Sequence, residues 1–234
     1  MKRYGLIFLL FMPLFSLASI SVNTMRITFP AKGKRFGDIL VYNSAKDTAY
    51  VAVTLEKLVH PGTKAQKLLP NHNLDPFDFG LVATPIKLVI PANQSRRVRI
   101  LPLQFATKDE IDYRVVATPE ENAIEVLEPN KRIAAGGVDV VVAYAVTIAL
   151  LPPKPKAILH VSQKGKQLTV SNSGNVSALL MEGKQCSEAP IVKCETLPAH
   201  RVYPGNNWHY TLKMPEPIHY TVQSASGRSW KITG

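Results

Sequence analysis

The stretch LVATPIKLVIPANQSRRVRIL, Leu81–Leu101, combines a short apolar run with two prolines and a basic cluster. Proline has no amide hydrogen to donate to a sheet, so Pro85 and Pro91 indicate strand ends rather than strand centres. The Thr84–Pro85 bond can be cis far more readily than an ordinary peptide bond. Pro91 and the two residues after it are typical of a turn. The stretch therefore predicts three short strands, 81–84, 86–90 and 96–102.

The third of these strands alternates in polarity. Val98 and Ile100 are expected on one face, and Arg97 and Arg99 on the other, because successive side chains of a strand point to opposite faces. Together with Arg96 the arginines form either an ordinary solvated strand face or a basic docking face. The sequence leaves both readings open.

Beyond this stretch the chain has the same character. Runs of five to eight residues rich in Val, Thr, Ile and Tyr are separated by Pro, Gly and Asn, and helical periodicity is absent after the N-terminal segment. The sequence predicts an all-β protein built of sandwiches. Three prolines within Leu150–Ala157 interrupt the pattern and predict a stiff connector. We expect domains at 19–151 and 157–234, joined by a proline-rich hinge at 152–156.

The first eighteen residues have the layout of a secretory signal peptide. Lys2 and Arg3 precede an apolar run from Leu6 to Phe15, and small residues surround the expected cleavage site after Ala18. No later apolar run has the length of a membrane span. The mature chain is thus expected to be exported, without membrane insertion.

Export to an oxidising compartment allows the two cysteines to form a disulfide. Cys186 and Cys194 have seven residues between them, and in an oxidising compartment such a pair most simply forms a local disulfide. No histidine stands at ligand spacing near them, so we expect no metal site.

Charge and motifs narrow the function. The formal net charge is +11, and loss of Lys2 and Arg3 would lower it by two, to +9, which favours acidic partners. Export argues against nucleic acid. Six scattered histidines, with no nucleophile elbow, zinc-binding helix or phosphate loop, predict neither an enzyme nor a cofactor.

The run VDVVVAYAVTIALL, Val138–Leu151, is apolar on both faces of the strand that it predicts. Such a strand is normally covered on both faces, but a two-layer sandwich covers only one. If the strand lies at a sheet edge, its unpaired backbone groups favour aggregation, unless their role is to pair with another chain. An ordinary core strand is the alternative.

These residues resemble a known family. ATPIKLVIPANQSRRVRI (Ala83–Ile100), YRV (Tyr113–Val115) and the Val-rich strand ending at Pro152 are similar to the first domain of the periplasmic pilus-assembly chaperones of the chaperone–usher pathway. YVAVTLEKLVHPGT (Tyr50–Thr63) and NSGNVSALLMEGKQC (Asn172–Cys186) are closer to the alternate branch, which serves class-5 type fimbriae. The likeness covers nearly the whole mature chain.

The resemblance implies a boomerang of two immunoglobulin-like domains. It also implies a periplasmic chaperone that binds fimbrial subunits by donor-strand complementation and delivers them to an outer-membrane usher. The donor side chains would lie at alternate positions of the long strand: Val138, Val140, Val142, Tyr144 and Val146. A self-capping homodimer of the free protein stays an open alternative.

In that family, basic residues also grip the terminal carboxylate of the subunit. Arg26 matches the first basic residue of the pattern. The positions for the second hold Thr147 and Ala149, so Arg114 is our candidate for the second anchor. A competing reading of the whole chain is a structural or adhesive immunoglobulin-like minor pilus component that keeps its strand for itself.

Overall fold

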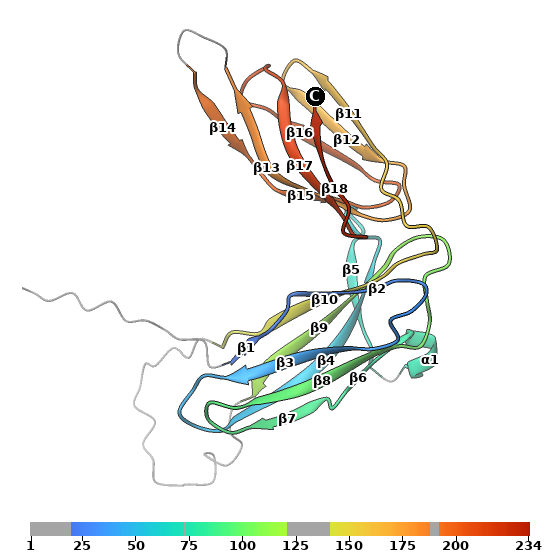
Figure 1. The fold of residues 1–234 in the computed structure, drawn as a ribbon, viewed down its shortest axis with the longest axis vertical. Coiled ribbons are helices and arrows are strands. Elements are labelled where there is room, and N and C mark those ends of the chain that lie inside the picture. The colour runs from blue at the N-terminus through green and yellow to red at the C-terminus, as the bar shows by residue number, and fades with distance from the viewer. Residues whose placement is uncertain (1–19, 73, 121–140, 188–191) are drawn as a thin grey trace, which may run out of the picture.

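The computed structural model describes residues 20–72, 74–120, 141–187 and 192–234. The predicted signal peptide lies outside them. The described residues form eighteen β-strands and one four-residue helix, which confirms the predicted all-β class. Two immunoglobulin-like sandwiches meet at an angle in the expected boomerang (Figure 1). No helix among these residues has both the length and the apolar character of a membrane span.

The first sandwich contains β1 to β10. One sheet has the order β1-β3-β8-β6: β1 (Ile20–Val22), β3 (Gly37–Asn43), β8 (Ser95–Pro102) and β6 (Leu81–Thr84). The other has the order β2-β10-β9-β4-β5, with β7 also paired to β4: β2 (Arg26–Phe29), β10 (Tyr144–Leu150), β9 (Ile111–Glu120), β4 (Ala49–Val59), β5 (Lys67–Pro70) and β7 (Lys87–Ile90). The helix α1 (Pro76–Phe79) precedes β6.

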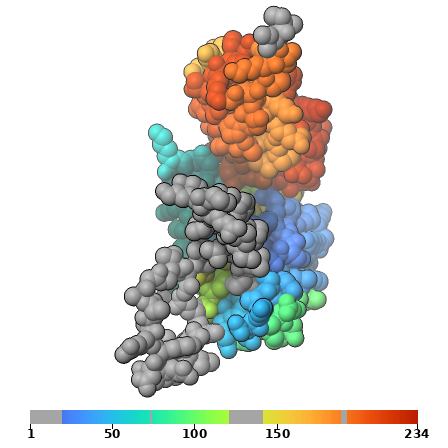
Figure 2. All heavy atoms as spheres, turned by 90° about the vertical axis from the view of Figure 1, so that its left-hand side faces the viewer, coloured from blue at the N-terminus to red at the C-terminus, as the bar shows by residue number. Residues whose placement is uncertain are grey.

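The second sandwich contains β11 to β18. Its smaller sheet has the order β11-β12-β16: β11 (Leu159–Lys164), β12 (Gln167–Asn172) and β16 (Asn207–Thr211). Its larger sheet has the order β14-β13-β17-β18, with β15 also paired to β13: β14 (Cys194–Leu197), β13 (Ala178–Cys186), β17 (Ile218–Ser224), β18 (Ser229–Thr233) and β15 (His200–Val202). In Figure 2 the orange and red atoms of this sandwich lie above the blue and green atoms of the first.

The proline-punctuated stretch folds as its pattern indicates. It forms β6, β7 and β8, the Thr84–Pro85 bond is cis, and Asn93 has a positive φ in the turn before β8. Val98 and Ile100 are buried, whereas Arg99 points outward and donates to Asp38 from Nε at 3.0 Å. The alternation thus separates a core face from a solvated face that includes an ion pair.

Each sandwich has its own apolar core. Strands of both sheets contribute to the first core, including Phe29, Ile39, Val115 and Ile148. Burying a side chain of this size contributes about 1.5–3 kcal/mol. Leu168, Leu180 and Val222 belong to the separate core of the second sandwich. A small third cluster joins the sandwiches: Ala149, Leu151, Val176 and Ala225.

Among the described residues, the Val-rich strand begins later than predicted. Val138–Val140 lie outside the described residues, and β10 begins at Tyr144 rather than at Val138. Its first antiparallel pair is Tyr144 with Ala117, so the ladder stops short of Pro119, which has no amide hydrogen.

Candidate functional site: an open strand edge and the cleft between the domains

The backbone of β10 is paired with a neighbouring strand along the whole of one edge, but along only part of the other edge. It pairs with β9 from Tyr144 to Leu150. On its other side β2 begins only at Arg26, which is in register with Thr147. The last backbone bond on this side runs from the Thr147 amide to the Met25 carbonyl, at 2.9 Å. Within the described part of the chain, Tyr144–Val146 therefore have an open edge on the β2 side.

The predicted donor side chains fall into three groups. Val138 and Val140 lie outside the described residues. Val142 is 38% exposed and Tyr144 is half-buried, so both are accessible at the start of the open edge.

Val146 differs from the other predicted donors. It is only 1% exposed and packs in the core of the first sandwich. Its position is a correction to the donor list: at this residue the row of alternate side chains turns into the chain's own core, because Val146 lies on the face of β10 that packs against the other sheet of the first sandwich. Val146 is not available to a partner in this structure.

The two predicted anchor residues lie in one row across the sheet. Arg26 on β2 is in register with Thr147 on β10, and Thr147 is in register with Arg114 on β9. Register partners share a face, so all three side chains are on the outer face of the sheet. Strands lie about 4.8 Å apart, so the two arginines stand about 10 Å apart with Thr147 between them. Both long side chains can reach a group placed over Thr147.

Arg26 is held by a buried acid. Its Nη2 donates to Glu110 Oε1 at 2.9 Å and lies 4.0 Å from Asp112 Oδ1. The Arg26 side chain is 26% exposed, and that of Glu110 only 1%. Arg114 is more open, with its Nε 4.0 Å from Glu56 Oε2 in the neighbouring strand. The structure thus places Arg26 at the edge of an internal charge cluster and Arg114 closer to solvent.

The second domain completes this cluster. The Ser177 amide and hydroxyl both donate to the Glu110 carboxylate, and Arg201 Nη1 donates to the Ser177 hydroxyl at 3.0 Å. The Glu110 amide in turn donates to the Asn175 carbonyl, at 2.9 Å. Glu110 therefore joins the two sandwiches while it also binds Arg26.

A pocket of about 260 Å³ opens beside this cluster. Its lining comes from four strands of the first domain, from the loop before β5, and from Tyr203 of the second domain. The residues around it are Leu58, Gln66, Leu68, Asp112, Tyr113, Arg114, Thr147 and Tyr203. The pocket thus lies in the cleft between the sandwiches, with Thr147 and Arg114 in its wall.

Asp112 is a site residue that the sequence did not reveal. It is only 4% exposed, and its Oδ1 has no hydrogen-bond partner among the described residues. Burial, reinforced by the neighbouring Glu110, raises the pKa of Asp112 to about 8, although Arg26 and Arg201 oppose the shift. Burial also raises the pKa of Tyr203 to about 12. Asp112 lies two residues before Arg114 on the same strand face, but its burial depends on the second domain.

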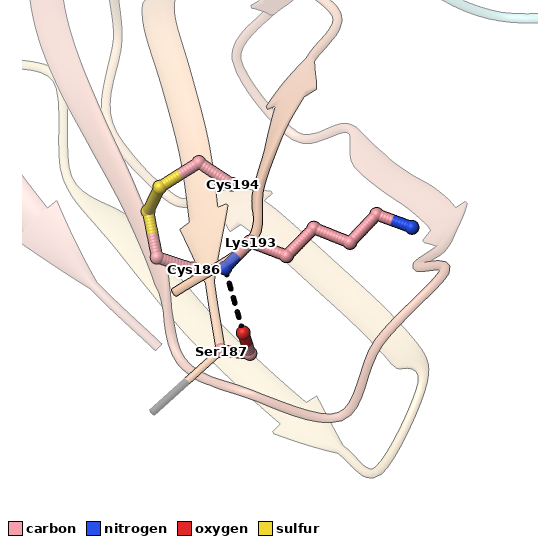
Figure 3. Close-up of a disulfide and its surroundings, with 4 residues drawn as sticks. All are labelled: Cys186, Ser187, Lys193 and Cys194. Carbon is pink, nitrogen blue, oxygen red and sulfur yellow. Dashed lines mark hydrogen bonds between the residues drawn. A yellow bond between two sulfur atoms is a disulfide. The ribbon is translucent and has the colours of Figure 1, made fainter. Parts of the chain in front are cut away.

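The cysteines lie far from this cleft. The Cys186–Cys194 disulfide joins the end of β13 to the start of β14, and the Lys193 amide donates to the Ser187 hydroxyl at 2.9 Å (Figure 3). The predicted bridge is thus present, and it closes a hairpin of the second sandwich.

Comparison with known proteins gives two kinds of likeness. No protein-family profile matches the chain. A CS1 fimbrial subunit of Escherichia coli is 28% identical over 200 residues, which cover 82% of this chain and 81% of that protein. A CFA/I fimbrial subunit of Escherichia coli is 28% identical over 156 residues, which cover 65% of this chain and 63% of that protein.

Solved structures with a similar fold include fimbrial chaperones. The class 5 fimbriae chaperone CfaA superposes with a TM-score of 0.63 at 19% identity, covering 92% of this chain and 97% of that one. The Escherichia coli chaperone DraB gives a TM-score of 0.63 at 14% identity, covering 93% and 96%. A chain of the Salmonella enterica complex of SafA pilin with the SafB chaperone also gives 0.63, at 15% identity and the same coverage. This chain therefore has the two-sandwich fold of fimbrial chaperones.

Proposed function

We propose that this protein is a periplasmic chaperone of fimbrial assembly. It binds fimbrial subunits by lending them the strand at the open edge of β10 and delivers them to an outer-membrane usher. The observation that carries the proposal is the combination of an open edge at Tyr144–Val146 with exposed valines directly before it. The open edge can form backbone hydrogen bonds with a strand of any sequence. The alternate apolar side chains then set the register in which the subunit strand pairs.

The cleft supports the same function. A subunit strand that extends along β10 toward β2 reaches Thr147 and meets Arg26 and Arg114 on either side. A guanidinium is well suited to bind a carboxylate through two hydrogen bonds. Arg26 uses Nη2 for Glu110, and its Nε and Nη1 have no described carboxylate partner. We assign Arg26 and Arg114 as the anchors of the subunit's terminal carboxylate.

Named relatives support the proposal at the level of protein class. The fold neighbours include a complex with a pilin and a chaperone–tip adhesin complex. Another neighbour is a periplasmic chaperone. The likeness to class 5 fimbriae chaperone CfaA agrees with the alternate branch that the sequence resembles.

A second function rests on a different observation. Both curated relatives are named as fimbrial subunits, which favours a minor pilus component that keeps β10 for itself. The two functions differ in stoichiometry and in destination. A chaperone is recovered from periplasm as a soluble one-to-one complex with its subunit, whereas finished fibres contain no chaperone.

The test is to tag the C-terminus, purify the protein from periplasm and measure the mass of the native complex. Purified fibres are then probed for the tag. A one-to-one complex with fibres free of the tag is the result we expect. Tagged fibres without such a complex would establish the pilus component instead.

A further inference from the structure

The pocket between the domains contains an acid in a place where a carboxylate is proposed to bind. Asp112 lines the pocket together with Arg114 and Thr147, and its Oδ1 lacks a hydrogen-bond partner among the described residues. An ionised carboxylate here would repel a second one at short range. The pocket therefore needs Asp112 in its neutral form to accept an anion.

The formal charges around Asp112 lead to the same conclusion. Arg114 lies on the same strand as Asp112, and Glu110 lies just before that strand. Arg26 lies on β2. Arg114 is matched by Glu56 of β4. The second domain contributes Arg201 and Tyr203, which face Asp112 across the cleft.

With Asp112 neutral, the guanidinium groups of Arg26 and Arg201 face a single carboxylate, that of Glu110. One positive charge is then uncompensated, which suits a monovalent anion. With Asp112 ionised, the two positive and two negative charges cancel, and an added anion gives an excess of negative charge beside two carboxylates that are almost fully buried.

We propose that Asp112 makes carboxylate binding in this pocket dependent on a proton: the anion enters while Asp112 is protonated and leaves when Asp112 ionises. This inference rests on the proposed function only for its biological ligand. The Tyr203 hydroxyl, whose pKa is raised to about 12, stays protonated throughout and can donate to the bound anion.

The size of the effect follows from the protonated fraction. The pKa of Asp112 is raised to about 8, so an anion that binds only the protonated form should bind about tenfold more weakly at pH 9 than at pH 7. By linkage, the bound anion should also raise the pKa of Asp112 further.

The experiment uses the mature protein and N-acetylglycine as the carboxylate probe, with N-acetylglycinamide as the neutral control. Binding is followed by NMR at the Thr147 amide and the arginine side chains, at pH 7, 8 and 9. We expect the carboxylate to bind in a pH-dependent way and the amide not to shift these signals. Equal affinity of N-acetylglycine at all three pH values, or no binding, would overturn the inference.

The variant Asp112→Asn separates Asp112 from other titrating groups. Its amide cannot ionise, so the ratio of affinities between pH 7 and pH 9 should fall from about tenfold to about one. An unchanged ratio would assign the pH dependence to another group. If this variant fails to fold, the ¹³C-carboxyl signal of Asp112 in the unaltered protein serves instead: its midpoint should rise on addition of N-acetylglycine, and a constant midpoint refutes the coupling.

Failure of this inference and failure of the chaperone function have different signatures. A protein that captures subunits but binds N-acetylglycine without pH dependence is a chaperone without the proton-linked pocket. A protein that binds N-acetylglycine in the predicted way but never forms a complex with fimbrial subunits has the pocket and another function.

Discussion

Arg26 donates from Nη2 to the buried Glu110 carboxylate at 2.9 Å, at the junction of the two sandwiches. Glu110 also receives both hydrogen bonds of Ser177 from the second domain. Arg26 is thus a structural residue of the domain junction as well as our candidate anchor for a ligand. The two roles have different consequences when the side chain is removed.

Replacing Arg26 by alanine should lower both stability and subunit capture. Leaving the buried Glu110 without its cation should cost about 2 kcal/mol in the free energy of unfolding. Urea unfolding measures this loss, and recovery of the subunit complex measures capture. Arg99→Ala is the matched control, because Arg99 also pairs with an acid, Asp38, but on the solvated face. It should leave both measurements close to those of the unaltered protein. Equal effects of the two substitutions would contradict a role of Arg26 in binding the subunit.

Val142→Glu should abolish subunit capture without unfolding the protein. Val142 is exposed before β10, so the free chain tolerates the charge, but a subunit pocket would have to bury it at high cost. We expect recovery of the complex to fall at least tenfold. Val141→Glu is the matched control, since Val141 is 52% exposed and points to the opposite face of an extended strand. Capture that is reduced equally by both changes, or by neither, would contradict a register set by alternate side chains.

Asp112→Asn should stabilise the protein increasingly as the pH rises. The pKa of Asp112 is near 3.9 in the unfolded chain and about 8 in the folded one. Between these values the unfolded state binds fewer protons, so folding loses stability with rising pH, and the loss is complete above about pH 8. A pKa displacement of one unit corresponds to about 1.4 kcal/mol, which urea unfolding can measure.

Unfolding curves at pH 5 and pH 8 test this prediction. The advantage of the asparagine variant over the unaltered protein should be larger at pH 8. An advantage of the same size at both values would mean that Asp112 titrates in the folded state as it does in the unfolded one.

Removal of the disulfide should weaken the second sandwich alone. Replacing Cys186 and Cys194 together by serine opens a loop with a sequence separation of 8, worth roughly 2–3 kcal/mol in the chain-entropy model. The bridge lies far from the cleft, so N-acetylglycine binding should persist below the melting temperature of the variant. A melting curve unchanged by the double replacement would show that the bridge contributes no stability.

Much of the strand pattern could be predicted from local sequence. The alternation of Val98 and Ile100 with arginines, and the prolines around β7, follow from the pleat of a strand and the missing amide of proline. The cysteine pair could be predicted equally well, since the sequence contains only these two cysteines. These features depend on neighbours in the chain, so the sequence alone determined them.

The cleft was decided by tertiary structure. Val146 continues the apolar row of its strand in the sequence, but whether it faces a partner or its own core depends on how far the other sheet of the first sandwich extends over β10. Glu110 and Asp112 read as ordinary acids beside a strand. Their side chains become buried next to each other because Ser177, Arg201 and Tyr203 of the second sandwich close over them. This burial depends on residues distant in sequence, so no local pattern contains it.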